Sequence, residues 1–364
     1  MVSKMFKSFK MFIVLALLVV MVVLSACNSN AKVNNSTGEN STEKTAIEET
    51  RKIVDMKGVE VEIPKQVNTF VESWFAHNAV DVMLRNAEGM LVTCCDEPTY
   101  QWMYRVCDNM HKAQFAKFSD SMNLEEIISL NPDVVFGSNE KYREMFANVG
   151  IPFVNCMFTN YDEMKKSIKL TAEVFGGDAI SKADKYIAYL DRKLAEVKAV
   201  TDTVKDDERT TIVHGSSVYK MGVDGRNTII NDWIGYSGGI NAAANDIDGN
   251  LQTMTMEQLL LWNPDVIITG DTEEEVEKIM SDDVWKNLKA VKEGRVYANP
   301  KGIFAWDRYG VEEALQFQWC SQKLYPELFA DFDIKAELKM FYKEFLNYNL
   351  TDDEAEKIIR HQNP

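Results

Sequence analysis

A fourteen-residue pattern that occurs twice constrains the fold of this chain more than any other feature of the sequence. Residues 123–136 read NLEEIISLNPDVVF, and residues 255–268 read TMEQLLLWNPDVII. In each copy a polar residue can cap a short amphipathic helix, Asn-Pro ends that helix, and an apolar run rich in β-branched residues follows as a buried strand. Two distant copies of one helix–strand unit predict two lobes of similar architecture.

A long helical pattern lies between the two copies. Residues 178–204 contain no proline or glycine, and apolar side chains recur there at steps of three and four, which is typical of one helix face. These side chains are Ile180, Ala183, Ile187, Leu190, Leu194 and Val197. A helix of this length would extend roughly 40 Å. It could be a core helix within one domain, but its position between the repeats favours a rigid strut that joins two lobes.

Short apolar runs around these markers predict strands separated by helical stretches, which indicates an α/β fold with mostly parallel sheets. The expected strands are at residues 69–71, 90–92, 134–136, 152–154, 211–213, 266–268 and 295–297. The tail, residues 333–360, predicts two helices joined by a turn. We divide the chain into a signal peptide (1–26), a lipidated cysteine with a flexible tether (27–50), an N-terminal lobe (51–177), the linking helix (178–204) and a C-terminal lobe with terminal helices (205–364).

The N-terminus has the pattern of a secretory signal peptide. Lys4, Lys7 and Lys10 precede an apolar run of 13 residues, which is shorter than the roughly 20 residues that a membrane span requires. Residues 24–27, LSAC, resemble the lipobox of bacterial lipoproteins, in which the thiol of Cys27 would carry the lipid. An ordinary cleaved signal with an incidental cysteine is the alternative. Because the polar segment that follows cannot form a core, we expect a protein tethered by lipid to the extracytoplasmic face of the cell membrane.

Composition and motifs disfavour several classes of function. The chain has 40 Lys+Arg against 56 Asp+Glu and a formal net charge of −16, which argues against a nucleic-acid partner. Only four histidines are present, which argues against a His-rich metal receptor. No G-x-S-x-G, H-E-x-x-H or Gly-rich phosphate loop occurs. His214 is close to Ser216 in sequence, but no orienting acid follows directly, so we expect no enzymatic activity and no cofactor.

Soft metal ligands are concentrated in one part of the N-terminal lobe. Within 18 residues the sequence has Cys94, Cys95, Met103, Cys107, Met110 and His111. Such side chains could ligate haem, cobalt or a soft metal. No CxxC or CxxCH occurs, and Cys and Met are common core residues, so we favour packing and assign no metal site. Five cysteines follow Cys27, and an odd number leaves at least one thiol unpaired.

The ordered set of motifs resembles the class III (cluster A) substrate-binding proteins of ABC importers, which are receptors for ferric siderophores, haem, vitamin B12 and some oxyanions. The resemblance is carried by the repeat, the linking helix and three further segments, residues 54–64, 284–297 and 319–329. It implies two similar lobes with mostly parallel central sheets, one long rigid α-helix joining them and a ligand cleft between them. The implied partners are an ABC permease and its ATPase, and we expect a monomer.

Ligands of open α/β sheets bind outside the carboxyl ends of the strands, so the segments that follow the strands are candidates. These are residues 73–77, 94–100, 137–139, 158–161, 214–219, 270–271 and 300–309. From them we select as ligand-binding residues Trp74, Tyr100, Tyr219, Trp306 and Arg308. An indole offers a flat apolar wall, and a guanidinium pairs with carboxylates, hydroxamates or oxyanions. The alternatives are core packing for the aromatic residues and an ion pair with Asp307 or a nearby Glu for Arg308.

Glu125 and Glu257 occupy equivalent positions in the two copies of the repeat. The resemblance implies that each lobe presents one surface glutamate here to arginines of the permease. Helix capping is the alternative, since a carboxylate in the first helical turn is stabilised by the helix dipole.

The cargo is expected to be an iron–siderophore, or a haem-type or corrinoid-type chelate, by analogy with the resembling family. Lys301 and Arg308 would favour an anionic chelate or an oxyanion such as molybdate. An oxyanion such as molybdate, or a free metal ion, is the alternative, and an extracellular hydrolase is a remote one.

Overall fold

The computed structural model describes residues 49–119 and 122–364. The predicted signal peptide, the predicted lipidation site Cys27 and the predicted tether up to residue 48 lie outside the described residues. Residues 48–364 group into one compact unit. Among the described residues, no helix is both long and apolar enough to cross a membrane.

The N-terminal lobe contains a five-stranded parallel sheet with the order β5-β4-β3-β6-β7. Its strands are β3 (Phe70–Glu72), β4 (Met90–Thr93), β5 (Gln114–Phe115), β6 (Val134–Gly137) and β7 (Phe153–Asn155). An antiparallel hairpin of β1 (Thr50–Val54) and β2 (Glu60–Pro64) precedes it. The order places β3 at the centre, so the segment after β3 starts from the middle of the sheet.

The C-terminal lobe contains a four-stranded parallel sheet with the order β10-β8-β12-β13. Its strands are β8 (Thr211–Gly215), β10 (Ile240–Asn241), β12 (Val266–Thr269) and β13 (Val296–Ala298). A small antiparallel pair of β9 (Gly222–Val223) and β11 (Gln252–Thr253) accompanies it. The expected α/β class with two parallel sheets is confirmed.

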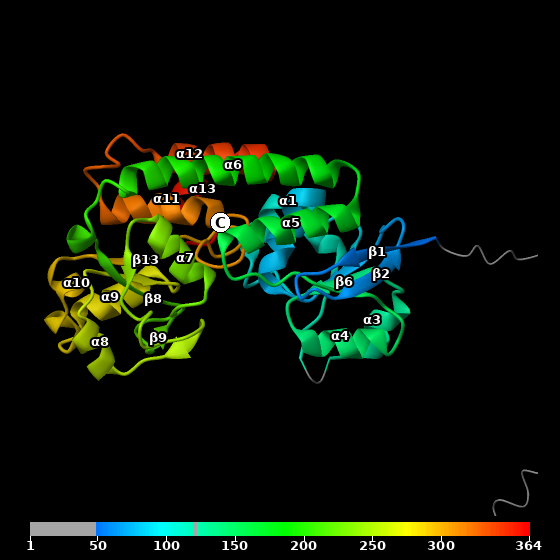
Figure 1. The fold of residues 1–364 in the computed structure, drawn as a ribbon, viewed down its shortest axis with the longest axis horizontal. Helices are drawn as coiled ribbons and strands as arrows, with labels where there is room; N and C mark the ends of the chain where they lie inside the picture. Colours follow the sequence, from blue (N-terminus) through cyan, green and yellow to red (C-terminus); the bar gives the residue numbers. More distant parts are fainter. Residues whose placement is uncertain (1–48, 120–121) are drawn as a thin grey trace, which may run out of the picture. The chain divides into compact units, whose positions relative to one another are not determined.

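Helices surround both sheets (Figure 1). The α-helices are α1 (Asn78–Arg85), α2 (Gln101–Val106), α3 (Leu124–Ser129), α4 (Glu140–Ala147), α5 (Tyr161–Phe175), α6 (Asp178–Thr201), α7 (Ile229–Tyr236), α8 (Met256–Trp262), α9 (Glu273–Ser281), α10 (Lys289–Lys292), α11 (Glu313–Leu324), α12 (Ile334–Phe345) and α13 (Asp352–Ile359). The 3₁₀ turns are η1 (Phe75–His77), η2 (Asp108–Lys112), η3 (Asp206–Glu208) and η4 (Trp285–Asn287). The sequence repeat corresponds to α3–β6 in one lobe and α8–β12 in the other, capped by Asn123 and Thr255.

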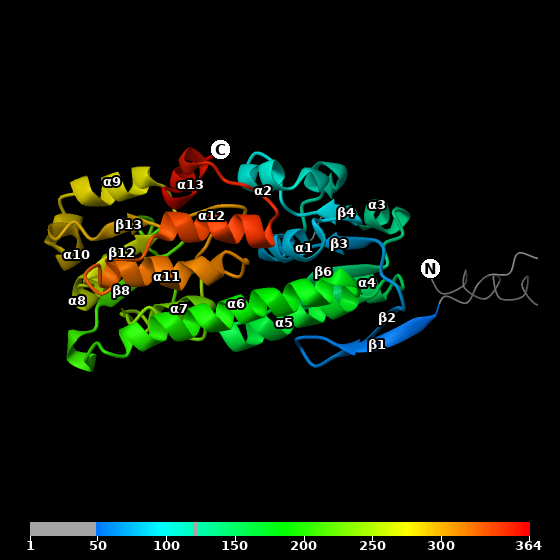
Figure 2. The same ribbon diagram turned by 90° about the horizontal axis from the view of Figure 1, so that it is seen from above.

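The 24-residue helix α6 extends over both lobes, as Figures 1 and 2 show. The three-and-four spacing predicted its buried face correctly from Ala183 to Val197, but Ile180, in its first turn, is 46% exposed. Polar groups of α6 also bind both lobes. Lys182 Nζ donates to the carbonyl of Leu84 at 3.1 Å, and the Tyr186 hydroxyl donates to the carbonyl of Val311 at 2.8 Å. The helix is therefore fixed to each lobe by packing and by hydrogen bonds.

The C-terminal segment forms a second connection that the sequence did not predict. Trp102 Nε1 of the N-terminal lobe donates to the carbonyl of Gln362 at 2.8 Å, and Arg105 pairs with Glu354 at 2.7 Å. Arg360 pairs with Glu273 of the C-terminal lobe at 2.8 Å. The α13 region thus contacts both lobes, which restricts their relative movement further.

Replacing Tyr186 with Phe tests how firmly α6 holds the loop that contains Val311. The variant removes one of two donors to the buried Val311 carbonyl, which keeps the Ala314 amide at 3.3 Å, so we expect the free energy of unfolding to fall by about 0.5–1.5 kcal/mol. Tyr297→Phe is the matched control, because its hydroxyl has no hydrogen bond among the described residues, and it should change stability by less than about 0.5 kcal/mol. Equal effects of the two variants in urea unfolding would contradict the prediction.

Candidate functional site

Aromatic side chains from both lobes meet beyond the carboxyl ends of the parallel strands. The ring centroid of Trp74, which follows β3, is 5.5 Å from that of Tyr309 in the loop after β13. Phe158, which follows β7, contacts both rings, at 5.7 Å from Trp74 and 5.5 Å from Tyr309. This group joins the N-terminal lobe to the C-terminal lobe through edge-to-face and tilted aromatic contacts.

A second aromatic group crosses between the lobes through Tyr100, which precedes α2. Its ring stacks on Phe304 with centroids 5.9 Å apart and on Phe75 at 6.1 Å. The Lys301 ammonium lies 5.8 Å from the Tyr100 ring centroid, within cation–π range. We call the six aromatic side chains of the two groups the aromatic seam: Trp74, Phe75, Tyr100, Phe158, Phe304 and Tyr309.

Tyr309 has a backbone conformation that bulky residues rarely adopt. Its φ is 58°, in the left-handed region that is unfavourable for non-glycine residues. Its amide donates to Glu313 Oε2 at 2.8 Å, and its hydroxyl accepts from Asn250 Nδ2 at 2.9 Å. These bonds hold the ring at the seam against a conformational cost of about 1–3 kcal/mol, and residues held in this way cluster at ligand-binding sites.

Four charged side chains next to Tyr309 form a network that we call the C-lobe charge cluster: His214, Asp224, Asp307 and Arg308. His214 lies between two carboxylates, with Nδ1 2.9 Å from Asp224 Oδ2 and Nε2 3.0 Å from Asp307 Oδ2. Arg308 Nη2 donates to Asp307 Oδ2 at 2.7 Å and to Asp224 Oδ2 at 3.3 Å. The side chain of Arg308 is 14% exposed, and those of the other three are fully buried.

The neighbours of each group set the protonation state of this cluster. Burial acts to lower the pKa of His214, but hydrogen bonds to Asp224 and Asp307 raise it above the ordinary value of 6.5. Burial acts to raise the pKa of Asp307, but Arg308 and His214 hold it well below its ordinary range. With His214 protonated, the two cations balance the two carboxylates, so Arg308 is already neutralised within the protein.

The structure brings three of the selected residues to the seam and leaves two elsewhere. Trp74 and Tyr100 belong to the seam, and Arg308 lies beside it with the expected alternative partner, Asp307. Trp306 is 0% exposed and donates to Glu312 at 3.2 Å, so it does not form the apolar wall that we expected. Tyr219 stacks on Trp285 within the C-terminal lobe, and its hydroxyl lies 3.3 Å from Asp282 Oδ2.

We expected no acidic side chain to orient His214, and this expectation was wrong. Asp224 and Asp307 both orient its ring, and both lie outside the sequence neighbourhood of His214. Because each ring nitrogen faces a carboxylate, the ring has no free lone pair to accept a proton from Ser216, whose side chain is exposed. The arrangement does not form a hydrolytic dyad.

The cluster of soft ligands does not converge on one point. All five described cysteines, Cys94, Cys95, Cys107, Cys156 and Cys320, are free and buried. Cys94 Sγ accepts from Asn78 at 3.4 Å, whereas His111 is 49% exposed at the surface. Met103 and Met110 are fully buried in the hydrophobic core. The packing interpretation of these side chains agrees with this arrangement.

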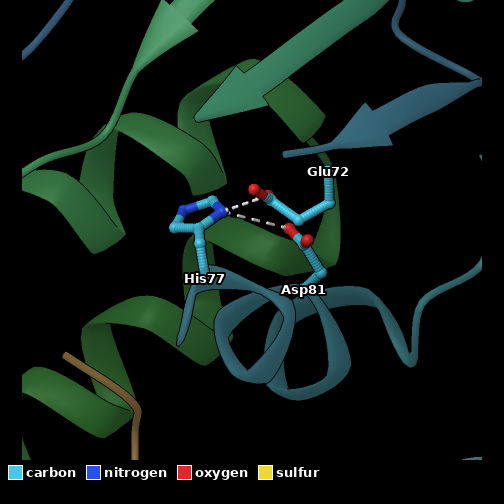
Figure 3. Close-up of side chains that lie close together, drawn as sticks. All are labelled: Glu72, His77 and Asp81. Atoms are coloured by element: carbon cyan, nitrogen blue, oxygen red, sulfur yellow. Dashed lines mark hydrogen bonds and ion pairs between the residues drawn. The ribbon is translucent and has the colours of Figure 1, made fainter. Parts of the chain in front are cut away.

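A different group of potential metal ligands lies beside Trp74. Glu72, His77 and Asp81 place one ligand atom each within 4.8 Å of one another, and all three are buried (Figure 3). Within residues 49–119 and 122–364, no other group of three or more His, Cys, Asp or Glu side chains brings its ligand atoms this close together. Burial, and then the neighbouring Glu72 carboxylate, raise the pKa of Asp81 well above its ordinary value.

Glu125 and Glu257 lie in the first turns of α3 and α8, and both are exposed. Asn123 accepts from the amide of Glu126, and Thr255 with Gln258 forms a capping box. The helix ends are therefore capped by other residues than Glu125 and Glu257. Neither of these glutamates has a hydrogen bond or ion pair within the described residues.

Sequence reasoning missed Phe158, Phe304 and Tyr309 as seam residues. All three lie in the segments that follow strands, so their positions gave a signal, but the sequence does not say which side chain of such a segment faces the other lobe. Asp224 gave no signal, because its contact with His214 depends on how β9 packs beside β8.

The raised pKa of His214 gives a prediction for stability. The folded-state pKa lies above the ordinary 6.5, so the stabilisation by the imidazolium is fully present below that pH and is lost as pH rises through the folded-state pKa. We expect the difference in unfolding free energy between wild type and His214→Gln to shrink as pH rises above about 6.5, by up to about 1.4 kcal/mol per pH unit. The control is His111→Gln, whose ring is half exposed. A difference that does not change with pH would contradict the prediction.

Comparisons with known proteins agree with this geometry. A family model described as periplasmic binding protein matches residues 110–302. The chain is 30% identical over 266 residues to the molybdate-binding protein MolA of Haemophilus influenzae, which covers 65% of this chain and 73% of that protein. It is 25% identical over 311 residues to the iron(3+)-hydroxamate-binding protein FhuD of Bacillus subtilis, which covers 82% of this chain and 92% of that protein.

Solved structures share the fold. A periplasmic solute binding protein from Veillonella parvula superposes with a TM-score of 0.72 at 23% identity, covering 86% of this chain and 97% of the other. MolA bound to molybdate superposes with a TM-score of 0.74 at 22% identity, covering 83% and 99%. The chain belongs to the periplasmic binding protein family, and it is an extracytoplasmic substrate-binding protein of an ABC importer rather than an enzyme.

Proposed function

We propose that the protein captures an iron–siderophore, or a haem-type or corrinoid-type metal chelate, and delivers it to an ABC permease. The observation that carries this proposal is the aromatic seam between the strand ends of the two lobes. The chelate would lie at the seam and replace part of the contacts between the lobes. Trp74, Tyr100 and Tyr309 would offer ring faces to its organic shell.

Arg308 and Lys301 would provide hydrogen bonds for an anionic chelate. Since Asp224 and Asp307 already balance the charge of Arg308, we expect this side chain to direct a hydrogen bond rather than to supply a free positive charge. Such a site suits a large ligand with dispersed charge better than a small, highly charged one. We do not include Trp306 or Tyr219 in the proposed site, because Trp306 is buried and Tyr219 packs against Trp285.

An oxyanion such as molybdate is the second candidate. It is favoured by the 30% identity to a molybdate-binding protein, of which the chain covers 73%. Against it stands the neutralised state of Arg308, because this side chain can offer a small, highly charged anion hydrogen bonds but no net positive charge.

We also propose that Cys27 carries a lipid that holds the receptor at the membrane as a monomer, and that Glu125 and Glu257 dock on the permease. The exposure of both glutamates and the capping of both helices by other residues support the docking role over the capping role.

A thermal-shift screen of the full chain tests the cargo. The panel contains ferric hydroxamates, ferric catecholates, ferric citrate, haem, cobalamin, molybdate and free metal ions. A ligand at a hundredfold excess over its dissociation constant adds about 2.7 kcal/mol, which should raise the midpoint by a few degrees. We expect one chelate class to do so. A shift with molybdate alone would replace the chelate proposal with the oxyanion alternative.

For the ligand found in this screen, we expect Trp74→Ala to weaken binding about 10–100-fold, or about 1.4–2.8 kcal/mol, because the variant removes one ring face of the seam. Tyr219→Phe is the control and should bind as the wild type does. Unchanged affinity of Trp74→Ala in calorimetry would remove this residue from the site.

The docking role predicts a separation of binding from transport. Glu125→Ala combined with Glu257→Ala should keep ligand affinity and abolish uptake in cells, because the carboxylates would contact only the permease. The matched control replaces Glu88 and Glu327, one exposed glutamate from each lobe outside the repeat. Normal uptake by the first double variant, or its loss of ligand affinity, would refute the assignment.

A further inference from the structure

The pocket formed by Glu72, His77 and Asp81 is built from three consecutive pieces of the N-terminal lobe. Glu72 ends β3, His77 ends η1, and Asp81 lies in the first turn of α1. His77 Nδ1 is 2.6 Å from Glu72 Oε2 and 3.7 Å from Asp81 Oδ1, with side-chain exposures of 1%, 0% and 0% (Figure 3). The imidazole nitrogen and both carboxylates therefore point at one another without access to water.

Thr171 fixes the orientation of the His77 ring. The Thr171 hydroxyl donates to the carbonyl of Ser167 at 3.0 Å, so its oxygen accepts from His77 Nε2–H at 2.9 Å. Burial acts to lower the pKa of His77, but the neighbouring Cys156, Glu72 and Asp81 raise it well above 6.5, so Nδ1 also carries a proton, which it donates to Glu72 Oε2 at 2.6 Å. A metal ion at Nδ1 would displace this proton, while the bond from Nε2–H to Thr171 would keep the ring in the orientation that a metal-ligating histidine needs.

His77 supplies at most one positive charge for the two carboxylates of the pocket. In the described part of the chain, the ion pairs of Glu72 and Asp81 are formed with His77. Glu72 Oε1 accepts from the amide of Trp74 at 2.7 Å, but both carboxylate oxygens of Asp81 are buried without a hydrogen-bond partner. An unpartnered buried carboxylate is costly unless a proton or a cation balances it.

The C-lobe charge cluster shows how the same problem is solved elsewhere in this chain. His214 also lies between two carboxylates, but there Arg308 supplies the second positive charge. The carboxylates of the Glu72 pocket form their ion pairs, within the described residues, with His77. No arginine or lysine of the described chain plays the part there that Arg308 plays in the C-lobe charge cluster.

We propose that Glu72, His77 and Asp81 bind one divalent transition-metal ion through His77 Nδ1 and one oxygen of each carboxylate. One imidazole nitrogen and carboxylate oxygens suit Zn²⁺ and its first-row neighbours. A divalent ion balances both carboxylates and gives the unpartnered Asp81 a partner. Its ligand atoms are close enough for one ion to contact all three after small side-chain movements.

The ion would be a resident one, separate from the transported cargo. The ring of Trp74 lies parallel to that of His77, with centroids 6.1 Å apart and 7° between ring planes, and the Trp74 amide is held by Glu72. An ion in the pocket would fix both groups, and through them the position of Trp74 in the aromatic seam.

Zinc binding by the full chain tests this site. After removal of metals with a chelator and equilibration with Zn²⁺ alone, we expect one equivalent of zinc per wild-type chain in elemental analysis. Asp81→Asn and Glu72→Gln should weaken zinc binding by at least about 100-fold, and Thr171→Val by about 10–100-fold, as loss of the hydrogen-bond partner of a metal-ligating histidine does. Zinc bound at another place in the chain would not be weakened by Thr171→Val, so the intermediate loss of affinity in this variant distinguishes the proposed site from other sites.

Asp133→Asn is the matched control, because Asp133 is an N-lobe carboxylate whose side chain, within the described residues, accepts from the backbone amides of Asn68 and Thr69 alone. It should bind zinc as the wild type does. Circular dichroism identifies any variant that fails to fold. If Asp81→Asn and Glu72→Gln do not fold, the rise in melting midpoint caused by zinc is compared between wild type and Thr171→Val, and it should be smaller in the variant. Zinc binding that is equal in Asp81→Asn and wild type, or absent from folded wild type, would overturn the proposal and leave protons as the only counter-charge in the pocket.

Discussion

Both lobes bury carboxylates near the ends of their strands, and each of these carboxylates must be matched with positive charge. The rest of the site depends on this constraint. In the C-terminal lobe, His214 and Arg308 balance Asp224 and Asp307 in a cluster with almost no exposure. Because each partner would be left as an unpaired buried charge without the others, the loop that contains Arg308 has little freedom. The position of Tyr309, the next residue, follows from this restriction.

The C-lobe charge cluster also helps to hold Tyr309 in its strained backbone conformation. Its φ of 58° is maintained by the bond to Glu313 on one side and by the fixed Arg308 on the other. The ring is thereby presented to Trp74 and Phe158 of the opposite lobe. A chelate that enters at the seam would meet aromatic surfaces whose positions are already set, which lowers the entropic cost of binding.

The connections between the lobes match this rigid design. Helix α6 binds both lobes, and the α13 region adds contacts on a separate path through Trp102, Arg105 and Arg360. With two connections, hinge movement of one lobe against the other requires breaking buried contacts. Small adjustments at the seam are therefore easier than large closure, and a ligand bound at the proposed site would be recognised by the side chains that already line it.

The sequence by itself determined the elements of this protein and their order. The repeat at residues 123–136 and 255–268, the helix pattern at 178–204 and the apolar runs are local signals, because helix and strand periodicity depends on neighbours within a few residues. Together they indicated two lobes with parallel sheets and a joining helix. They also predicted a ligand site in the segments after the strands, since that position follows from the topology of α/β sheets.

Tertiary structure alone decided which side chains of those segments meet. Trp306 and Arg308 are two positions apart, yet Trp306 is buried against Glu312 and Arg308 lies beside the seam, paired with Asp307. Other contacts join residues that are far apart in the chain. Examples are the ion pairs of His214 with Asp224 and Asp307 and the hydrogen bond between His77 and Thr171. Charge balance, protonation and exposure depend on such contacts, because they are set by distances in space that no local pattern encodes.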